Sequence, residues 1–150
     1  NFDLLSVAEE AAHDLENTAA EKGVSLSVSG ESVFVNGIKR LLYEVIYNLG
    51  ENAVKYNVEN GSVFISVAKS GENAVITVKD SGIGIAPEHQ SRIFERFYRV
   101  DKSHSKSSGG TGLGLSIVKH AVMLHGGQIE LESEPGCGTT IKVIIPRSGK

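Results

Sequence analysis

Apolar and polar positions alternate with two different periods along the chain, and these periods mark out helices and strands. Residues 38–56 predict a strongly amphipathic helix, because apolar side chains recur every three or four positions, at Ile38, Leu41, Leu42, Val45, Ile46, Leu49 and Ala53. Residues 4–21 are rich in Ala, Leu and Glu and precede Gly23, so we expect a helix that ends there. A third helix is predicted over 113–124 and a short one over 87–94.

Short segments of alternating apolar and polar residues predict strands, over 24–29, 32–35, 62–67, 74–78, 128–132 and 140–145. The segments 62–67 and 74–78 form the clearest hairpin, with a turn around residues 71–73. Several strands are adjacent in sequence and no β-α-β alternation is sustained. We therefore expect an α+β fold in which a mixed, mostly antiparallel sheet is backed by helices on one face. Without a repeat or a second core, residues 1–150 are expected to form one domain.

Composition narrows the class of protein. The chain has 150 residues, 40% of them hydrophobic, which suffices for one core. Its net charge of −3 disfavours binding of nucleic acid. The single Cys137 excludes a disulfide framework and a cysteine-rich metal site. We find no apolar run of about 18 residues and no signal-peptide pattern, and because the chain begins with Asn1 we expect it to be a piece of a longer protein.

Glycine is in excess, with 17 residues, of which ten lie between 82 and 138. Tight turns would explain the cluster, and so would a backbone that must approach a ligand closely. Residues 109–114, Gly-Gly-Thr-Gly-Leu-Gly, run into a predicted helix, and backbone amides at a helix N-terminus favour anions such as phosphate. The segment is not a P-loop, and it is not G-x-G-x-x-G because Ile117 stands where the third glycine would be.

The predicted helix 38–56 has a polar face with candidate chemistry. Glu44, Asn48, Glu51 and Lys55 share this face, and Asn52 lies at its edge. A solvated surface explains the two glutamates. Asn, however, is a mediocre helix former that needs hydrogen-bond partners near a core, and its amide oxygen suits Mg²⁺.

Two further segments carry candidate chemistry. Asp80 ends a predicted strand and is followed by Ser-Gly-Ile-Gly; its carboxylate could accept a hydrogen bond from an exocyclic amine such as that of adenine, or simply form an Asx turn. Residues 92–106 hold five Lys or Arg against two Asp or Glu, with three aromatic residues. This segment is either an exposed basic helix end or a lid whose cations meet a polyphosphate.

Four segments, in this order, closely resemble the motifs of the catalytic and ATP-binding domain of two-component sensor histidine kinases. Residues 48–56 resemble the N box, 80–84 the first glycine box, 94–99 the F box and 110–115 the second glycine box. The resemblance covers essentially the whole chain. It implies a two-layer α/β sandwich in which ATP lies beneath a flexible lid, in agreement with the α+β fold expected above.

The resemblance also implies roles for single residues. Asp80 would accept the adenine amine, Tyr56 would lie against the purine, and Asn52 would coordinate Mg²⁺ with Asn48 nearby. The other nucleotide-binding residues would be Lys55, Gly82, Gly84, Ile85, Tyr98, Arg99, Gly110, Thr111, Gly112, Leu113, Gly114, Leu115 and Thr139.

The implied catalytic residues are Asn48, Lys55 and Arg99, with Lys55 at a phosphate and Arg99 approaching the phosphates from the lid. Related ATPases such as gyrase, mismatch-repair proteins and heat-shock chaperones carry a Glu one helical turn before the Mg²⁺-binding Asn. That Glu is a general base for water, whereas Asn48 cannot accept a proton. The kinase interpretation is therefore favoured over hydrolysis.

We accordingly expect a domain that binds ATP and Mg²⁺ and transfers the γ-phosphoryl group to a histidine on a separate helical dimerisation domain of the same full-length protein. A response regulator would act downstream. The family's phosphoacceptor motif is absent around all five histidines. The fragment is expected to be monomeric, and the full-length protein a homodimer whose cytoplasmic part this is, anchored in a membrane.

Alternatives remain open from the sequence. The chain could be an ATP-hydrolysing or serine-kinase member of the same superfamily, or a regulatory nucleotide-binding module without catalysis. Gly50 departs from the family, which usually has a large apolar residue there, and glycine inside a helix costs about 1 kcal/mol relative to alanine.

Overall fold

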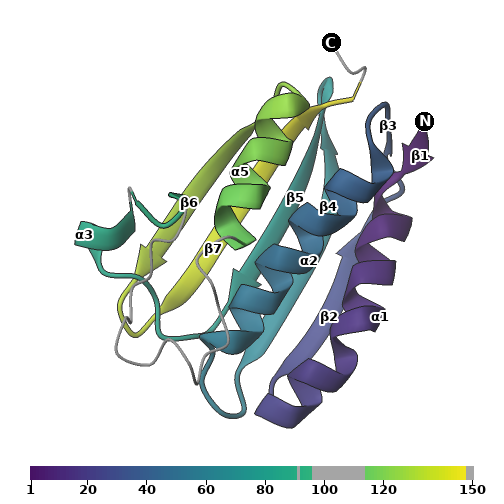
Figure 1. Cartoon of the computed structure of the whole chain (residues 1–150). Helices are drawn as coiled ribbons and strands as arrows, with labels where there is room; N and C mark the ends of the chain where they lie inside the picture. Colours follow the sequence, from purple (N-terminus) through teal and green to yellow (C-terminus); the bar gives the residue numbers. More distant parts are fainter. Residues whose placement is uncertain (91, 96–113, 148–150) are drawn as a thin grey trace.

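A computed structural model describes residues 1–90, 92–95 and 114–147. Three helices cover one face of a five-stranded sheet, so the predicted α+β sandwich is confirmed (Figure 1). The helices are α1 (Leu4–Lys22), α2 (Lys39–Lys55), the short α3 (Pro87–Gln90) and α5 (Gly114–Leu124). The strands are β1 (Phe2–Asp3), β2 (Ser25–Gly30), β3 (Phe34–Val35), β4 (Ser62–Ser70), β5 (Asn73–Asp80), β6 (Gln128–Glu134) and β7 (Gly138–Pro146).

The sheet has the strand order β2-β4-β5-β7-β6, and only the β2–β4 pair is parallel. A separate antiparallel pair joins β1 to β3. In the register of β5 and β7, Asp80 lies opposite Thr139. The end of β5 and the start of β7 therefore meet at one edge of the sandwich, where the polar segments after Asp80 leave the sheet.

The core lies between the helical layer and the sheet. The apolar stripe of α2 supplies the buried Leu42, Val45, Ile46 and Leu49, which belong to the same cluster as the inward side chains of β4, β5 and β7. The opposite sheet face carries mostly polar side chains, as alternation requires. Helix α2 contacts both α1 and α5 and is thus the central helix of its layer (Figure 1).

Gly50 lies on the side of α2 that packs against α1. A Cβ atom at this position would be 2.7 Å from Cδ1 of Leu15 and 3.5 Å from Cδ1 of Ile65. Leu15 is fully buried, so its side chain occupies the space that a larger residue at position 50 would fill. Close packing of the two helices therefore explains the glycine that departs from the family.

The structure differs from the predicted elements in several places. Strand β1 was not predicted, because two residues carry no periodicity. The short helix ends at Gln90, whereas the prediction ran to 94; residues 92–95 form turns. Strands β4 and β5 are longer than predicted, because the ladder continues through exposed polar residues up to Ser70 and Asn73. Among the described residues, no helix is long and apolar enough to cross a membrane.

Candidate functional site

The Asp80 carboxylate lies at the end of β5 with one of its two oxygens held by backbone amides. Oδ1 accepts a hydrogen bond from the amide of Gly82 at 2.8 Å and from that of Thr139 at 3.2 Å. The first bond is the Asx turn considered above. Within the described part of the chain, Oδ2 has no hydrogen-bond donor. Burial raises the pKa of Asp80 above 3.8, although the two amide hydrogen bonds oppose this shift.

Gly82 and Gly84 follow Asp80 in a loop that is pressed against other backbone. A Cβ at Gly82 would be 2.5 Å from the carbonyl oxygen of Tyr56, and one at Gly84 would be 2.0 Å from that of Glu134. Gly84 also has a positive φ of 75°, which disfavours any larger residue. Contacts within the protein are therefore enough to explain why both positions are glycine. That the two glycines also leave space for a ligand stays a prediction.

The loop is tied to the last turn of α2 and to the β6–β7 turn. The amide of Ile83 donates to the carbonyl oxygen of Tyr56 at 3.1 Å. The amide of Ile85 donates to Oγ of Ser133 at 2.8 Å, and this hydroxyl is 2.8 Å from Oγ1 of Thr139. The structure therefore brings five predicted residues to one place: Tyr56, Asp80, Gly82, Ile85 and Thr139.

Asn57 is a structural residue of this site that the sequence analysis missed. It is buried, with 9% of its surface exposed. Its Nδ2 donates to the carbonyl oxygen of Ser62 at 2.9 Å, and its Oδ1 accepts from the amide of Val58 and, at 3.3 Å, from the hydroxyl of Ser81. Asn57 thus joins the end of α2, the start of β4 and the Asp80 loop. An Asn just after a helix is typical of a cap, so its sequence position gave no signal of these contacts.

Asn48 lies against the first residue of α5. Its Nδ2 donates to the carbonyl oxygen of Glu44 at 2.8 Å, one helical turn earlier. Its Oδ1 would be 3.3 Å from a Cβ at Gly114, so Gly114 lets α5 begin close to the amide. The structure therefore places the end of the predicted phosphate-binding segment beside Asn48, and Leu115 packs against the core next to it.

Helix α2 connects these two groups of residues. Nζ of Lys55 lies 5.7 Å from the centre of the Tyr56 ring, and 37% of the surface of Tyr56 is exposed. Asn52 is half-buried between Asn48 and Tyr56. Eight residue steps separate Asn48 from Tyr56 and correspond to about 12 Å along a helix axis, so the α5 start and the Asp80 loop lie at the two ends of one polar stretch.

The remaining predicted site residues fall outside the described residues, and their predicted roles stay predictions. They are Tyr98, Arg99, Gly110, Thr111, Gly112 and Leu113.

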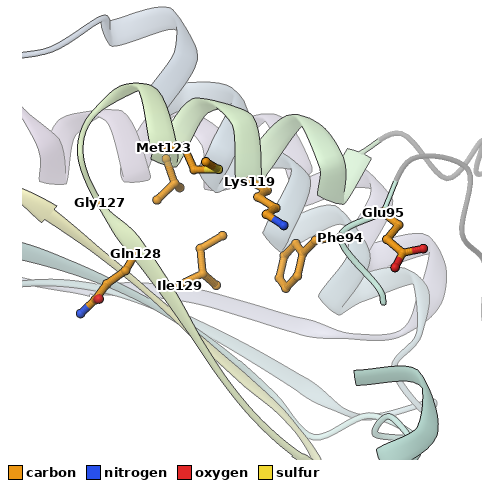
Figure 2. A pocket seen from close by; sticks show the side chains of 8 residues that line it. Phe94, Glu95, Lys119, Met123, Gly127, Gln128 and Ile129 are labelled. Atoms are coloured by element: carbon orange, nitrogen blue, oxygen red, sulfur yellow. The ribbon is translucent and has the colours of Figure 1, made fainter. Parts of the chain in front are cut away.

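No group of three or more His, Cys, Asp or Glu that could hold a metal ion is found in the described ranges. A pocket of about 350 Å³ opens between α5, β6 and Phe94, and its walls include Lys119, Met123 and Ile129 (Figure 2). Of the described residues predicted to bind nucleotide, none lines this pocket. The pocket is therefore separate from the Asp80 loop.

Comparison with known proteins agrees with this architecture. The family model described as histidine kinase-, DNA gyrase B-, and HSP90-like ATPase matches residues 37–149. The sensor-like histidine kinase SenX3 of Mycolicibacterium smegmatis is 43% identical over 145 residues, which are 96% of this chain and 38% of SenX3. The sensor histidine kinase RppB of Synechocystis sp. is 41% identical over 128 residues, 85% of this chain and 28% of RppB. The chain thus spans well under half of these relatives.

Solved structures of histidine kinases share the fold. The mycobacterial sensor histidine kinase MprB matches with a TM-score of 0.86 and 26% identity, over 97% of each chain. The catalytic domain of histidine kinase ThkA, in a nucleotide-free form, matches with a TM-score of 0.85 and 26% identity, over 99% of this chain and 95% of that one. Full-length ShkA in complex with AMPPNP matches with a TM-score of 0.83 and 28% identity, over 97% of this chain and 30% of that one.

Proposed function

Because the chain belongs to the histidine kinase-, DNA gyrase B-, and HSP90-like ATPase family, we propose that it is the catalytic domain of a sensor histidine kinase. It binds ATP with Mg²⁺ and delivers the γ-phosphoryl group to a histidine on a separate helical dimerisation domain. That domain and a membrane anchor belong to the full-length protein of this proposal, and a separate response regulator acts downstream of it.

The Asp80 carboxylate is the observation that carries the nucleotide proposal. Two backbone amides fix Oδ1, so the orientation of the carboxylate is set before any ligand arrives. A half-buried carboxylate oxygen without a donor is unfavourable until a donor reaches it. The exocyclic amine of adenine is such a donor, and the exposed ring of Tyr56 offers an apolar surface for the purine close to the same loop.

The opposite end of the polar stretch of α2 suits the phosphates. The start of α5 lies against Asn48, and a helix N-terminus attracts negative charge. The distance of about 12 Å along α2 leaves room for the ribose and phosphate chain between the adenine end and this helix start. ShkA, which shares the fold, was solved with AMPPNP, an ATP analogue, and this supports a nucleotide site in the present chain.

Asn52 would hold Mg²⁺ through its amide oxygen. The Asn52 side chain forms no hydrogen bond to another described residue and lies between the two ends of the site. A single neutral oxygen ligand suits Mg²⁺, which keeps several waters and takes its other ligands from phosphates. The bound ion would neutralise phosphate charge, as is general for phosphoryl transfer.

The residues of α2 favour transfer to a protein nucleophile over hydrolysis. Asn48 is held by its hydrogen bond to the carbonyl of Glu44, and an amide accepts no proton from water. The nearby Glu44 pairs with Arg40 at 3.6 Å. The chain therefore positions and neutralises the phosphates without supplying a general base at position 48, and the histidine nucleophile needs none to attack.

Nucleotide binding by this chain is the first test. Isothermal titration with ADP and Mg²⁺ should show binding by the wild type and about 10- to 100-fold weaker binding by Asp80→Asn, the loss of one charge-assisted hydrogen bond. Glu72→Gln, a change in the exposed β4–β5 turn at the other end of β5, is the matched control and should bind as the wild type does. Equal affinities of wild type and Asp80→Asn would refute the role of Asp80.

The kinase step needs its partner domain. The chain is mixed with a separately prepared helical dimerisation domain that carries a phosphoacceptor histidine and with γ-labelled ATP. We expect acid-labile, base-stable phosphohistidine on the partner and slow release of free phosphate. Rapid phosphate release without phosphohistidine would instead identify an ATPase, and label on a serine would identify a serine kinase.

A further inference from the structure

His125 connects the C-terminal end of α5 to the N-terminal end of α2, two elements that lie far apart in the sequence. Its Nε2 is 3.0 Å from the backbone nitrogen of Ile38, and its Nδ1 is 2.8 Å from the carbonyl oxygen of Ala121. Ile38 is the N-cap of α2, and His125 directly follows the last residue of α5. One imidazole therefore contacts both helices that meet at Asn48 and Gly114.

The two partners fix the protonation state of the ring. A carbonyl oxygen only accepts hydrogen bonds, so Nδ1 of His125 must carry a proton toward Ala121. A backbone N–H only donates, so Nε2 must be unprotonated to accept from Ile38. Only the neutral imidazole with its proton on Nδ1 satisfies both contacts. A protonated Nε2 would face the N–H of Ile38 and remove this hydrogen bond.

Helix α2 has no other means of making this bond. In a capping box, the side chain three residues after the N-cap accepts a hydrogen bond from the N-cap amide. Here the N-cap is Ile38, which forms no side-chain capping bond, and the residue three positions later is Leu41, which has no acceptor. His125 supplies the missing acceptor from a different helix.

The surroundings of His125 are shaped to hold the ring in place. A Cβ at Gly37 would be 2.7 Å from both Cδ2 and Nε2 of His125, so only glycine leaves room for the imidazole at this approach. On the other side, Gly126 adopts a positive φ of 71°, and a Cβ at Gly127 would be 2.4 Å from the carbonyl oxygen of Ile144 in β7. These glycines therefore let the turn after α5 approach both Gly37 and β7 closely.

The charged side chains of the elements around this contact are basic. The first turn of α2 carries Lys39 and Arg40 and no acidic residue. Arg147, which follows β7, lies near the start of this helix, because its carbonyl oxygen accepts a hydrogen bond from the amide of Asn36. On α5, the nearest titratable side chains are Lys119 and the exposed His120. In the described ranges no carboxylate forms an ion pair with His125.

We propose that His125 is a positioning residue that holds α2 and α5 together only while its imidazole is neutral, so that acidification weakens nucleotide binding. The residues proposed to bind nucleotide lie on α2 and at the start of α5, so this inference rests on the proposed function.

The test compares the affinity for ADP and Mg²⁺ at pH 7.5 and 5.5 in four proteins. His125→Gln places a non-titrating acceptor near Ile38, His125→Ala removes the acceptor, and His120→Gln is the matched control on the same helix. Titration of the nucleotide and of Asp80 affects all four proteins alike, so only ratios between proteins are compared. We expect the wild type to bind about threefold to tenfold more tightly than His125→Ala at pH 7.5, and to lose this advantage at pH 5.5.

His125→Gln should keep its advantage over His125→Ala at both pH values, and His120→Gln should follow the wild type. A ratio of wild type to His125→Ala that does not change with pH would overturn the inference. A second readout does not need nucleotide: nitrogen NMR should show His125 protonated on Nδ1 and bare on Nε2 at pH 7.5. The opposite tautomer would overturn the inference, whereas the predicted tautomer without any ADP binding would overturn the proposed function instead.

Discussion

Replacing Gly50 by alanine tests whether helix packing, and not chance, explains this glycine. The substitution has two opposing effects. Alanine is the better helix former by about 1 kcal/mol. Its Cβ, however, would be 2.7 Å from Cδ1 of Leu15, and ordinary contact begins at about 3.4 Å. The leucine would have to withdraw by about 0.7 Å within a core in which it is fully buried.

Overpacking of this kind costs about 1–3 kcal/mol. With about 1 kcal/mol regained from helix propensity, Gly50→Ala should destabilise the domain by about 1 kcal/mol, which lowers the melting temperature by about 2–4 °C. Leu15→Ala alone should cost about 2–5 kcal/mol because it leaves a cavity. In that background the methyl group introduced at position 50 has space, so Gly50→Ala should be stabilising by about 1 kcal/mol.

Urea unfolding of the wild type, the two single variants and the double variant gives the four free energies of a double-mutant cycle. The two effects of Gly50→Ala, of opposite sign in the two backgrounds, predict a coupling of about 2 kcal/mol between positions 15 and 50. If Gly50→Ala stabilised the protein equally with Leu15 present and absent, the contact between α1 and α2 would not be the reason for the glycine.

Three further predictions concern stability. Burial raises the pKa of Asp80, so the folded protein binds a proton at this carboxyl more readily than the unfolded chain does. Proton binding at Asp80 therefore stabilises the fold below the ordinary pKa of 3.8, and this stabilisation is lost as the pH rises through the raised pKa. Thermal unfolding should therefore show Asp80→Asn gaining stability relative to wild type as the pH rises above 3.8, and a constant difference would contradict this. The Tyr43 hydroxyl donates to Asp14, so Tyr43→Phe should cost about 1 kcal/mol in urea unfolding, unlike the control Tyr47→Phe. Gly82→Ala should cost at least about 2 kcal/mol, because its Cβ would meet backbone and not a flexible side chain; a melting temperature equal to that of wild type would show that the loop yields.

Secondary structure was predictable from sequence where apolar periodicity was strong. Helix α2 begins and ends within one residue of its predicted bounds, since seven apolar positions repeat along it. The two-residue β1 and the true length of α3 were not predictable, because so few residues carry no period. The parallel pairing of β2 with β4 depends on how α2 returns the chain to the sheet, which local patterns do not encode.

The sequence predicted which residues belong to the candidate site better than it predicted the contacts that these residues make. Asp80 was identified because a carboxylate at the end of a strand can accept a hydrogen bond from a ligand amine. Asn48 was identified because an Asn in the middle of a helix needs hydrogen-bond partners. Gly82, by contrast, is explained by the nearby carbonyl oxygen of Tyr56. The sequence alone cannot distinguish a glycine that packs against backbone from one that leaves space for a ligand. Asn57 and His125 were missed because each also bonds to groups of other elements, Ser62 and Ser81 for Asn57 and Ile38 for His125, which become neighbours only after folding.

The pairing of Asp80 with Thr139 across β5 and β7 has a consequence for how the proposed site is kept in place. The chain leaves β5 at Asp80, passes through α5 and β6, and enters β7 at Gly138, and the β5–β7 ladder holds these two points side by side. Because the amide of Thr139 donates to Oδ1 of Asp80 across this ladder, the adenine-facing end of the proposed site is held by the sheet itself and not by the segments that join the two strands.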